Sequence, residues 1–382
     1  MALKGIKVIE LVGLAPAPFC GMLLSDFGAT VTRIDKIAYN PLDVLKHGKR
    51  NIALNLKQTE GRNILRDLCM KSDVLIEPYR PGVMEKLGLG PDILLKDNPK
   101  LIYARLTGFG QKGALAQRAG HDINYLAISG VLSFLGRKNE KPTAPVNLLA
   151  DFAGGGLLCA FGILAALLSR QNTGKGQIVD SSMVEGAAYV ASFLNRSQTL
   201  PIWGKDRGDN LLDTGTYFYD TYETKDGKFM SVGCLEEPFF QIMLKTLGIE
   251  GKLTQFDDNE KGRKVLHDIF LTKTQDEWTQ IFEKTDSCVF PVLNWAQASE
   301  YPHNKLRDTF TTSENPENSE KVVVPNPAPK LSETPASSSF LKQQKDEWEN
   351  INEILKEIGY QDEKIRQLVK SNAILVSTKG KL

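Results

Sequence analysis

The opening third of the chain alternates between short apolar runs and stretches with helical spacing of apolar positions. Residues 4–11 and 29–35 are apolar or β-branched, and the apolar stretch Phe19–Phe27 lies between them. Strand, helix and strand in this order form a βαβ unit, in which the strands are parallel and the crossover is right-handed. Similar strand-like runs follow helical segments at 74–77 and 101–106. The pattern predicts an α/β fold with a doubly wound parallel sheet.

A different pattern begins at Thr214. The segments TYFYDTYET and FMSVGCL flank a turn that contains Asp226-Gly227, a combination typical of a β-hairpin. Helical stretches follow, then a segment rich in Pro, Ser, Glu and Asn, and then apolar residues spaced as in amphipathic helices. We expect five segments: the first part of a large domain at 1–190, a linker at 191–213, a small α+β domain at 214–310, a second linker at 311–340, and C-terminal helices at 341–382 that return to the large domain.

Charge and apolar run length limit the classes of partner. The 47 Lys and Arg residues nearly balance the 46 Asp and Glu residues, so no strong overall field favours nucleic acid or an anionic membrane. The longest uncharged apolar run, Phe152–Leu168, falls short of the ~20 residues that span a bilayer. We expect it to form a buried helix, and we expect neither a nucleic-acid nor a membrane partner.

Cysteine and histidine positions give no metal pattern. The five cysteines include no C-x-x-C pair, and the four histidines are scattered, so we expect a reducing compartment and no metal site. The first residues lack the apolar core of a secretory signal. The last three, Gly380-Lys381-Leu382, match the Ser-Lys-Leu peroxisomal signal at two positions, although an accidental basic tail is equally compatible with them.

The first turn of the predicted sheet argues against a dinucleotide cofactor. In place of G-x-G-x-x-G it reads GLAPAP at 13–18, and its prolines remove backbone donors that a pyrophosphate needs. NAD is therefore disfavoured, and Asp35 is interpreted as a residue at a strand end. Gly174-Lys175-Gly176 follows a helical segment, so it is interpreted as a helix C-cap and not as part of a phosphate-binding loop.

Two short motifs carry candidate acid/base groups. In AGHDINYLAISG, His121 and Asp122 open a predicted helix, where the positive end of the helix dipole favours a neutral, basic imidazole. In NLLADFAGGG, Asp151 lies among apolar residues that would raise its pKa, and the glycines would allow a substrate close to the backbone. A structural histidine beside a capping Asp122, and a capping Asp151, remain open alternatives. Glu236, after an apolar strand, is on its own typical of a solvated or capping group.

Several motifs together resemble one family over nearly the whole chain. They are GIKVIELVGLAPAPFC near the start, DVLIEPYRPGVMEKLGLGP at 73–91, LIYARLTGFGQ at 101–111, the two motifs above and TGKGQIVDSSMVEG at 173–186. Each is weak alone, whereas the set in this order is specific. It resembles the α-methylacyl-CoA racemase branch of the family III CoA-transferases.

The resemblance implies a fold, an assembly and a substrate. The fold is a large Rossmann-like parallel-sheet domain with a smaller α+β domain, and two chains interlock so that each active site joins the large domain of one to the small domain of the other. The implied partners are an acyl-CoA substrate and a second copy of the chain, with no metal or redox cofactor, in peroxisomes, mitochondria or both.

The resemblance also assigns roles to individual residues. His121 and Asp151 correspond to opposed acid/base groups, Glu236 to the carboxylate that supports the histidine, and Asp122 lies where backbone N–H groups would receive an enolate oxygen. The residues expected to contact CoA are Lys36, Arg80, Lys86, Arg105 and Tyr125.

These roles fit the chemistry of racemisation. Removing the weakly acidic α-proton of a thioester requires a positioned base and a stabilised enolate, and inversion requires a second group on the opposite face. The main alternative is a family III CoA-transferase that uses Asp151 as a nucleophile, against which His121 argues. A non-catalytic acyl-CoA-binding protein is a further alternative. Its one support is Thr214-Gly215-Thr216-Tyr217, which replaces the Gly-Gly-Ala-Pro usual in the family and puts the acyl preference in doubt.

Overall fold

The computed structural model describes residues 1–37, 44–314, 320–342 and 345–377, so the tail motif at 380–382 lies outside the described residues. The chain divides into two compact units. Unit 1 comprises Met1–Ser129, Val146–Val190 and Leu306–Leu382, and unit 2 comprises Gly130–Pro145 and Ala191–Lys305. Each unit has its own apolar core.

Unit 1 is built on a seven-stranded sheet in the order β12-β3-β2-β1-β4-β5-β6. All neighbours pair in parallel except β12, which is antiparallel to β3. The strands are β1 (Lys7–Leu11), β2 (Thr30–Asp35), β3 (Arg50–Leu54), β4 (Val74–Glu77), β5 (Ile102–Thr107), β6 (Ile178–Ser182) and β12 (Ile374–Leu375). The order of the six parallel strands is that of a doubly wound Rossmann-like fold, as predicted, and its switch point lies between β1 and β4.

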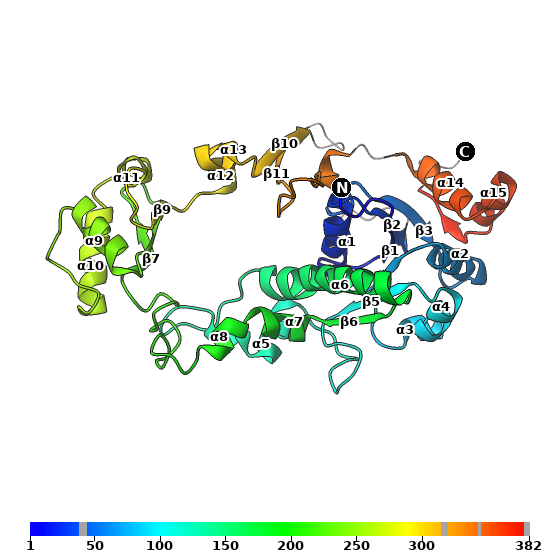
Figure 1. Cartoon of the computed structure of the whole chain (residues 1–382), viewed down its shortest axis with the longest axis horizontal. Coiled ribbons are helices and arrows are strands. Elements are labelled where there is room, and N and C mark those ends of the chain that lie inside the picture. The colour runs from blue at the N-terminus through cyan, green and yellow to red at the C-terminus, as the bar shows by residue number, and fades with distance from the viewer. Residues whose placement is uncertain (38–43, 315–319, 343–344, 378–382) are drawn as a thin grey trace. The chain divides into compact units, whose positions relative to one another are not determined.

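Helices cover both faces of this sheet (Figure 1). On one face α1 (Pro16–Asp26) packs on β1 and β2, and α6 (Leu158–Thr173) packs on β5 and β6. On the other face α2 (Thr59–Met70) and α14 (Glu347–Glu357) pack on β3. The remaining helices of unit 1 are α3 (Val83–Lys86), α4 (Pro91–Asp97), α5 (Asp122–Ser129), α7 (Met183–Val190), α15 (Asp362–Lys370), the 3-10 helix η3 (Ser339–Leu341) and the π-helix η2 (Leu148–Leu157).

The C-terminal helices complete the core of unit 1. Ile351, Ile354 and Leu355 of α14 are fully buried, and Ile52 and Leu54 of β3 are each only 1% exposed. These side chains belong to one apolar cluster, so the chain returns after some 300 residues to cover the sheet that its first strands began. This burial explains the apolar spacing of 346–369 in physical terms, since an amphipathic helix is stabilised mainly by packing its apolar face.

The helix η2 continues into α6 and is more exposed than the sequence suggests. Of the described residues, one helical stretch, Leu148–Thr173, is long and apolar enough to cross a membrane by length and composition, and 44% of its most apolar window is buried. Ile163 and Ala166 face the sheet, whereas large apolar side chains on another face are exposed: Leu157, Phe161, Leu164 and Leu168. The expectation of a buried helix therefore holds for one face only.

Unit 2 contains an antiparallel sheet in the order β7-β8-β9 and a helical layer. The hairpin of β7 (Tyr219–Glu223) and β8 (Phe229–Gly233) turns where the sequence predicts, with Gly227 in the left-handed region at φ 71°. The other elements are β9 (Val289–Pro291), η1 (Val131–Phe134), α8 (Ser192–Arg196), α9 (Glu237–Thr246), α10 (Asn259–Phe270), α11 (Gln275–Phe282), α12 (Trp295–Glu300) and α13 (Pro302–Leu306). Phe240, Phe270 and Tyr217 fill the core.

The units differ from the predicted segments in three places. Residues 130–145, assigned to the large domain, belong to unit 2 because Arg137 pairs with Asp220 at 3.0 Å and Lys138 with Asp209 at 3.2 Å. Residues 191–213, expected to be a linker, also belong to unit 2 and contain α8. The second expected linker contains the antiparallel ribbon of β10 (Phe310–Glu314) and β11 (Lys321–Pro325), where β-branched residues pair.

Candidate active site

The start of α5 is fastened to the start of η2 by one side chain. The Asp122 carboxylate accepts hydrogen bonds from the backbone N–H of Ala150 at 2.8 Å and of Asp151 at 2.7 Å. Asp122 is far from Ala150 and Asp151 in the sequence. It directly follows His121, the first predicted acid/base group, and Asp151, the second, is one of the two donors. The structure thereby brings His121 and Asp151 into one region of unit 1.

His121 is held by its backbone and leaves its ring exposed. Its N–H donates to the Asn124 side chain at 3.0 Å, and its C=O accepts from the N–H of Asn124 at 2.8 Å and of Tyr125 at 3.2 Å. The Tyr125 hydroxyl donates to the C=O of Gly120. These hydrogen bonds fix the backbone of the turn before α5, and the His121 imidazole extends from it into solvent.

Asp151 is half-buried in the first turn of η2. Burial raises the pKa of its carboxyl, the side-chain amide of Asn147 at 3.3 Å lowers it, the charge of Asp122 raises it, and His121 lowers it, with a net rise. The His121 effect shows that the two predicted groups interact electrostatically. A carboxyl with a raised pKa exchanges its proton more readily near neutral pH, which suits an acid/base role.

Two expectations about these motifs need correction. Asp151 does not cap the helix, because Asn147 stands at the N-cap and Asp151 lies within η2. The glycines after it do not face an open site: a Cβ on Gly154 would lie 2.5 Å from the backbone N of Ala187, and one on Gly156 would lie 2.7 Å from the C=O of Pro16. These glycines allow η2 to pack closely against α7 and α1.

The cations expected to bind CoA lie partly at the switch point of the sheet. Lys36 follows β2, and its ammonium sits 4.4 Å over the ring of Tyr79, which follows β4. Arg80, next in sequence, is exposed. Its positive charge partly offsets the rise that burial causes in the pKa of the Tyr125 hydroxyl, and Tyr125 is 8% exposed. Lys86 is exposed at the end of α3. In doubly wound sheets, ligands bind beyond the carboxyl ends of the strands at this point, so the positions of Lys36 and Arg80 suit a nucleotide.

Arg105 is placed differently. Its side chain is 8% exposed and pairs with Glu77 at 2.9 Å and with Glu85 at 2.8 Å. The other carboxylate oxygen of Glu77 accepts from the backbone N–H of Tyr79 at 2.6 Å. Through Glu77, Arg105 therefore supports the turn that carries Tyr79 and Arg80. A direct contact between Arg105 and CoA stays a prediction.

The remaining predicted features lie in unit 2. Glu236 is exposed at the N-cap of α9. In the segment that departs from the family pattern, Thr214 has φ 73° and Tyr217 is fully buried, with its hydroxyl donating to the C=O of Thr254 at 2.6 Å. Tyr217 therefore belongs to the core of this unit, so the substitution alters packing there rather than an open surface.

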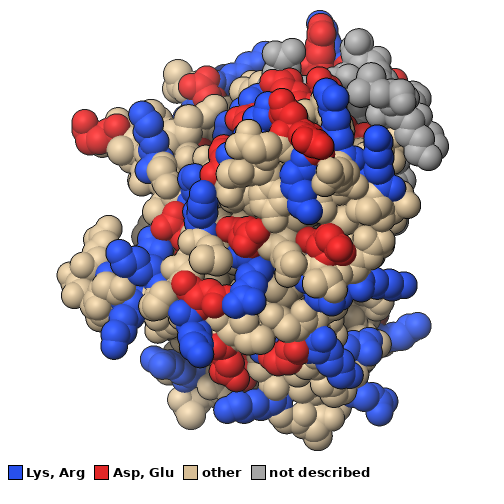
Figure 2. All heavy atoms as spheres, turned by 90° about the vertical axis from the view of Figure 1, so that its right-hand side faces the viewer, with Lys and Arg blue, Asp and Glu red and all other residues tan. Residues whose placement is uncertain are grey.

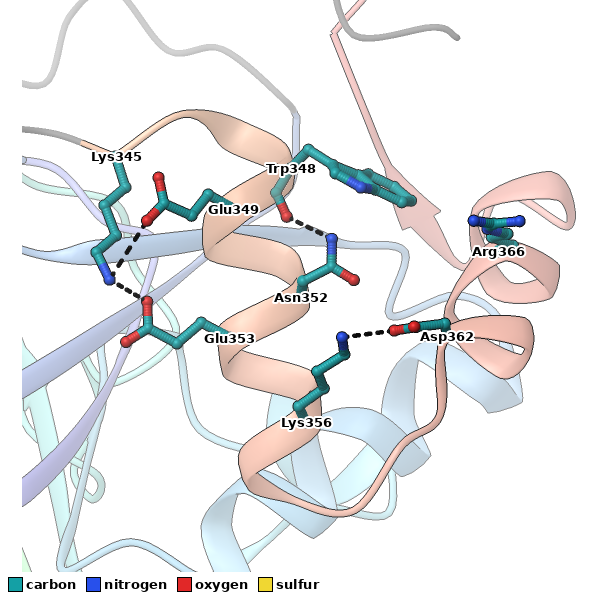
Figure 3. A pocket seen from close by; sticks show the side chains of 8 residues that line it. All are labelled: Lys345, Trp348, Glu349, Asn352, Glu353, Lys356, Asp362 and Arg366. Carbon is teal, nitrogen blue, oxygen red and sulfur yellow. Dashed lines mark hydrogen bonds and ion pairs between the residues drawn. The ribbon is translucent and has the colours of Figure 1, made fainter.

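A hollow outside this region lacks the expected chemistry. A hollow of about 570 Å³ lies between α14 and α15, where Lys345 pairs with Glu353 and Lys356 with Asp362 (Figure 3). It contains none of the predicted acid/base groups. Basic and acidic side chains are interspersed over the face that includes these helices (Figure 2). Among the residues the structure describes, no three His, Cys, Asp or Glu side chains are grouped to hold a metal ion.

Sequence reasoning missed three supporting residues. Asn147 lies four positions before Asp151, a spacing that places two side chains on one helix face and could have identified it. Glu77 and Glu85 could not have been paired with Arg105 in this way, because the three residues come from two strands and a helix.

Comparisons with known proteins identify the family to which the chain belongs. The model of CoA-transferase family III matches residues 3–342. The chain is 52% identical over 387 residues to an alpha-methylacyl-CoA racemase of Homo sapiens, and 50% identical over 386 residues to that of Mus musculus, covering 100% of this chain and 99% of each relative. A CAIB/BAIF family protein from Brucella suis shares the fold with a TM-score of 0.78 at 24% identity, covering 93% of this chain and 99% of that one. The resemblance seen in the motifs is thus confirmed, and the chain belongs to CoA-transferase family III.

Proposed function

We propose that the protein is a racemase that interconverts (2R)- and (2S)-2-methylacyl-CoA thioesters. The observation that carries this proposal is the fastening of Asp122 to the backbone of Asp151, which brings His121 and Asp151 together in unit 1. The full-length similarity to two alpha-methylacyl-CoA racemases supports the same reaction.

The reaction needs two groups that exchange roles. One group removes the α-proton and the other returns a proton to the opposite face of the enolate, so the starting form of the enzyme carries one proton on the pair. His121, as the neutral imidazole, accepts the proton in one direction while protonated Asp151 donates. In the reverse direction, Asp151 accepts and the imidazolium donates. The raised pKa of Asp151 favours this sharing, because a carboxyl of ordinary pKa would almost never carry the proton near neutrality.

The enolate oxygen requires donors that are already in place. Backbone N–H groups at the start of α5 are suited to this role, since the helix dipole places partial positive charge there. The exposed Arg80 and Lys36 would bind the CoA phosphates, and Glu236 would be the carboxylate that supports the His121 ring.

The exposed apolar face that runs from the end of η2 along α6 supports a homodimer. Leu157, Phe161, Leu164 and Leu168 recur at helical spacing, and exposed side chains of this size in a contiguous stripe mark interaction sites. A membrane is the alternative cover for such a helix. We favour a second copy because the other face of the same helix packs on the sheet of unit 1. The address of the enzyme, proposed as peroxisome, mitochondrion or both, rests on the C-terminal tripeptide and the resemblance.

A transferase assay separates the racemase from the family's other chemistry. A CoA-transferase would use Asp151 to form a mixed anhydride and would move CoA to a free carboxylate. Purified protein, a single-epimer 2-methylacyl-CoA and a free 2-methyl carboxylate should yield both epimers of the thioester and no new acyl-CoA from the added acid. Transfer of CoA to that acid without epimerisation would contradict the proposal.

A further inference from the structure

Asp122 is the more deeply buried of the two neighbouring predicted residues. Asp122 is only 4% exposed, whereas His121 is exposed. One carboxylate oxygen, Oδ2, takes both backbone hydrogen bonds from η2. The other, Oδ1, is buried without a hydrogen-bond partner among the described residues. A carboxylate in this position has no solvent access of the kind that a proton-transfer group needs.

The geometry points to a different role. We propose that Asp122 is a positioning residue, whose buried, negatively charged carboxylate holds the backbone of Asp151 against the start of α5. This inference rests on the proposed racemase function. It gives the side chain of Asp122 a role beside the one expected for the backbone N–H groups at the start of α5, which would receive the enolate oxygen.

The hydrogen bonds supply the positioning. They join the N–H groups of Ala150 and Asp151, at the first turn of η2, to the residue that follows His121. Charge-assisted bonds to backbone N–H groups are about twice as strong as neutral ones. Loss of the carboxylate would leave two N–H groups at the helix start unsatisfied and would free η2 to shift relative to α5.

The surroundings of Asp151 make the charge effective. Asn147, at the N-cap of η2, donates to it, and it interacts electrostatically with Asp122 and Tyr125 of α5 and with His121, which precedes α5. The other elements packed on η2 present uncharged surface, charges paired elsewhere (among them Arg170 of α6 with Asp73) or, in Glu185 of α7, an exposed carboxylate. The α1 side is Pro16 and Phe19, the α7 side is Met183 and Ala187 with Glu185 exposed, and on β5 and β6 Arg105 is paired with glutamates and Asp180 accepts from the backbone of Gln111.

Two substitutions separate charge from geometry. Asp122→Asn keeps an oxygen that can accept both N–H groups but removes the charge, and Asp122→Glu keeps the charge but moves the oxygens by one methylene. We would measure kcat and kcat/KM for epimerisation from pH 4 to 9, with thermal unfolding as a check on folding.

The inference predicts opposite signatures. In Asp122→Asn, the acidic limb of the pH profile moves to lower pH, because Asp151 holds its proton less tightly. In Asp122→Glu, the limb stays in place and kcat falls by about tenfold or more, since small displacements of reacting groups are costly. As a matched control, Asn147→Leu removes the amide that donates to the Asp151 carboxylate and moves the limb to higher pH.

The outcomes distinguish this inference from the proposed function. Wild-type epimerisation with an unchanged acidic limb in Asp122→Asn and unchanged kcat in Asp122→Glu would overturn the role of Asp122 and leave the racemase intact. Absence of epimerisation in the wild-type protein would overturn both. If Asp122→Asn does not fold, the kcat and pH profile of Asp122→Glu still decide whether Asp122 positions Asp151.

Discussion

Nε of Arg105 lies 2.9 Å from a carboxylate oxygen of Glu77, and both side chains are almost wholly buried. The pair joins β5 to β4, and the second bond of Arg105, to Glu85 at 2.8 Å, extends the connection to α3. The turn that carries Arg80 therefore begins at an ion pair inside the sheet. Arg105 therefore supports the turn from inside the protein, whereas the exposed Arg80 is the residue proposed to touch CoA.

Arg105→Ala is expected to unfold the protein more easily. Removing one partner of a buried ion pair leaves the other charge uncompensated, which costs about 3–5 kcal/mol. Chemical denaturation with a circular-dichroism readout measures the loss. The matched variant Arg80→Ala removes an exposed cation and should leave stability unchanged while raising KM for acyl-CoA. Unchanged stability in Arg105→Ala together with a raised KM would show that Arg105 binds CoA directly.

Asp151→Asn is expected to abolish epimerisation without loss of CoA binding. The amide cannot take up or return a proton, and a positioned acid/base group contributes about 10²–10⁴-fold to the rate. Steady-state assays would report activity, and calorimetry with CoA would report binding. Turnover close to that of the wild type would remove Asp151 from the mechanism.

The same substitution should change how stability depends on pH. The folded-state pKa of Asp151 is raised, so the folded protein holds a proton that the unfolded chain, with a pKa of about 3.9, has released. This residue's contribution to stability is therefore greatest at low pH and declines as pH rises from about 4 through the folded-state pKa. Asn lacks this decline, so Asp151→Asn should gain Tm relative to the wild type from pH 4 toward neutrality. A Tm difference that is constant over that range would contradict the raised pKa.

Phe161→Glu is expected to disrupt the proposed homodimer. Phe161 is 64% exposed in the apolar stripe of α6, and a carboxylate there would be buried in the dimer at high cost. Sedimentation velocity should show a smaller species than the wild type forms. Met70→Glu is the control, because Met70 is similarly exposed on α2, outside the stripe. A wild-type protein that is monomeric and active would refute the interlocked assembly.

Gly186→Ala should destabilise the packing that supports Asp151. An added Cβ would lie 1.8 Å from the backbone C=O of Gly154, so η2 and α7 would have to separate. Overpacking of this kind typically costs about 1–3 kcal/mol. Thermal unfolding and kcat should fall together, and unchanged values of both would show that the two helices can move apart freely.

The outline of the fold could be predicted because it follows from local pattern. The runs at 4–11, 29–35 and 74–77 are apolar or β-branched, bounded by turns, and they form β1, β2 and β4 nearly as expected. The π-helix η2 could not be predicted, since its backbone depends on close packing against α1 and α7 rather than on its own propensities.

The sequence predicted which residues form the candidate site better than it predicted the contacts between them. His121 and Asp151 stand in motifs that suggest acid/base chemistry, and the structure brings them together. The side chain that does so, Asp122, bonds to backbone groups 28 and 29 residues away, and no spacing rule reveals a partner that contributes only its main chain. Arg105 shows the converse, since a cation in a matching motif proves to be paired with carboxylates inside the protein.

The most direct test of the racemase proposal follows the α-proton itself. A single-epimer 2-methylacyl-CoA would be incubated with purified protein in deuterium oxide, and α-deuterium content and epimer ratio would be followed together by mass spectrometry and chiral separation. The two-group scheme predicts deuterium incorporation with convergence to the same epimer mixture from either starting epimer. Convergence should be lost in Asp151→Asn and in His121→Ala, although His121→Ala can still exchange on one face. No exchange with any 2-methylacyl-CoA, or full convergence in His121→Ala, would contradict it.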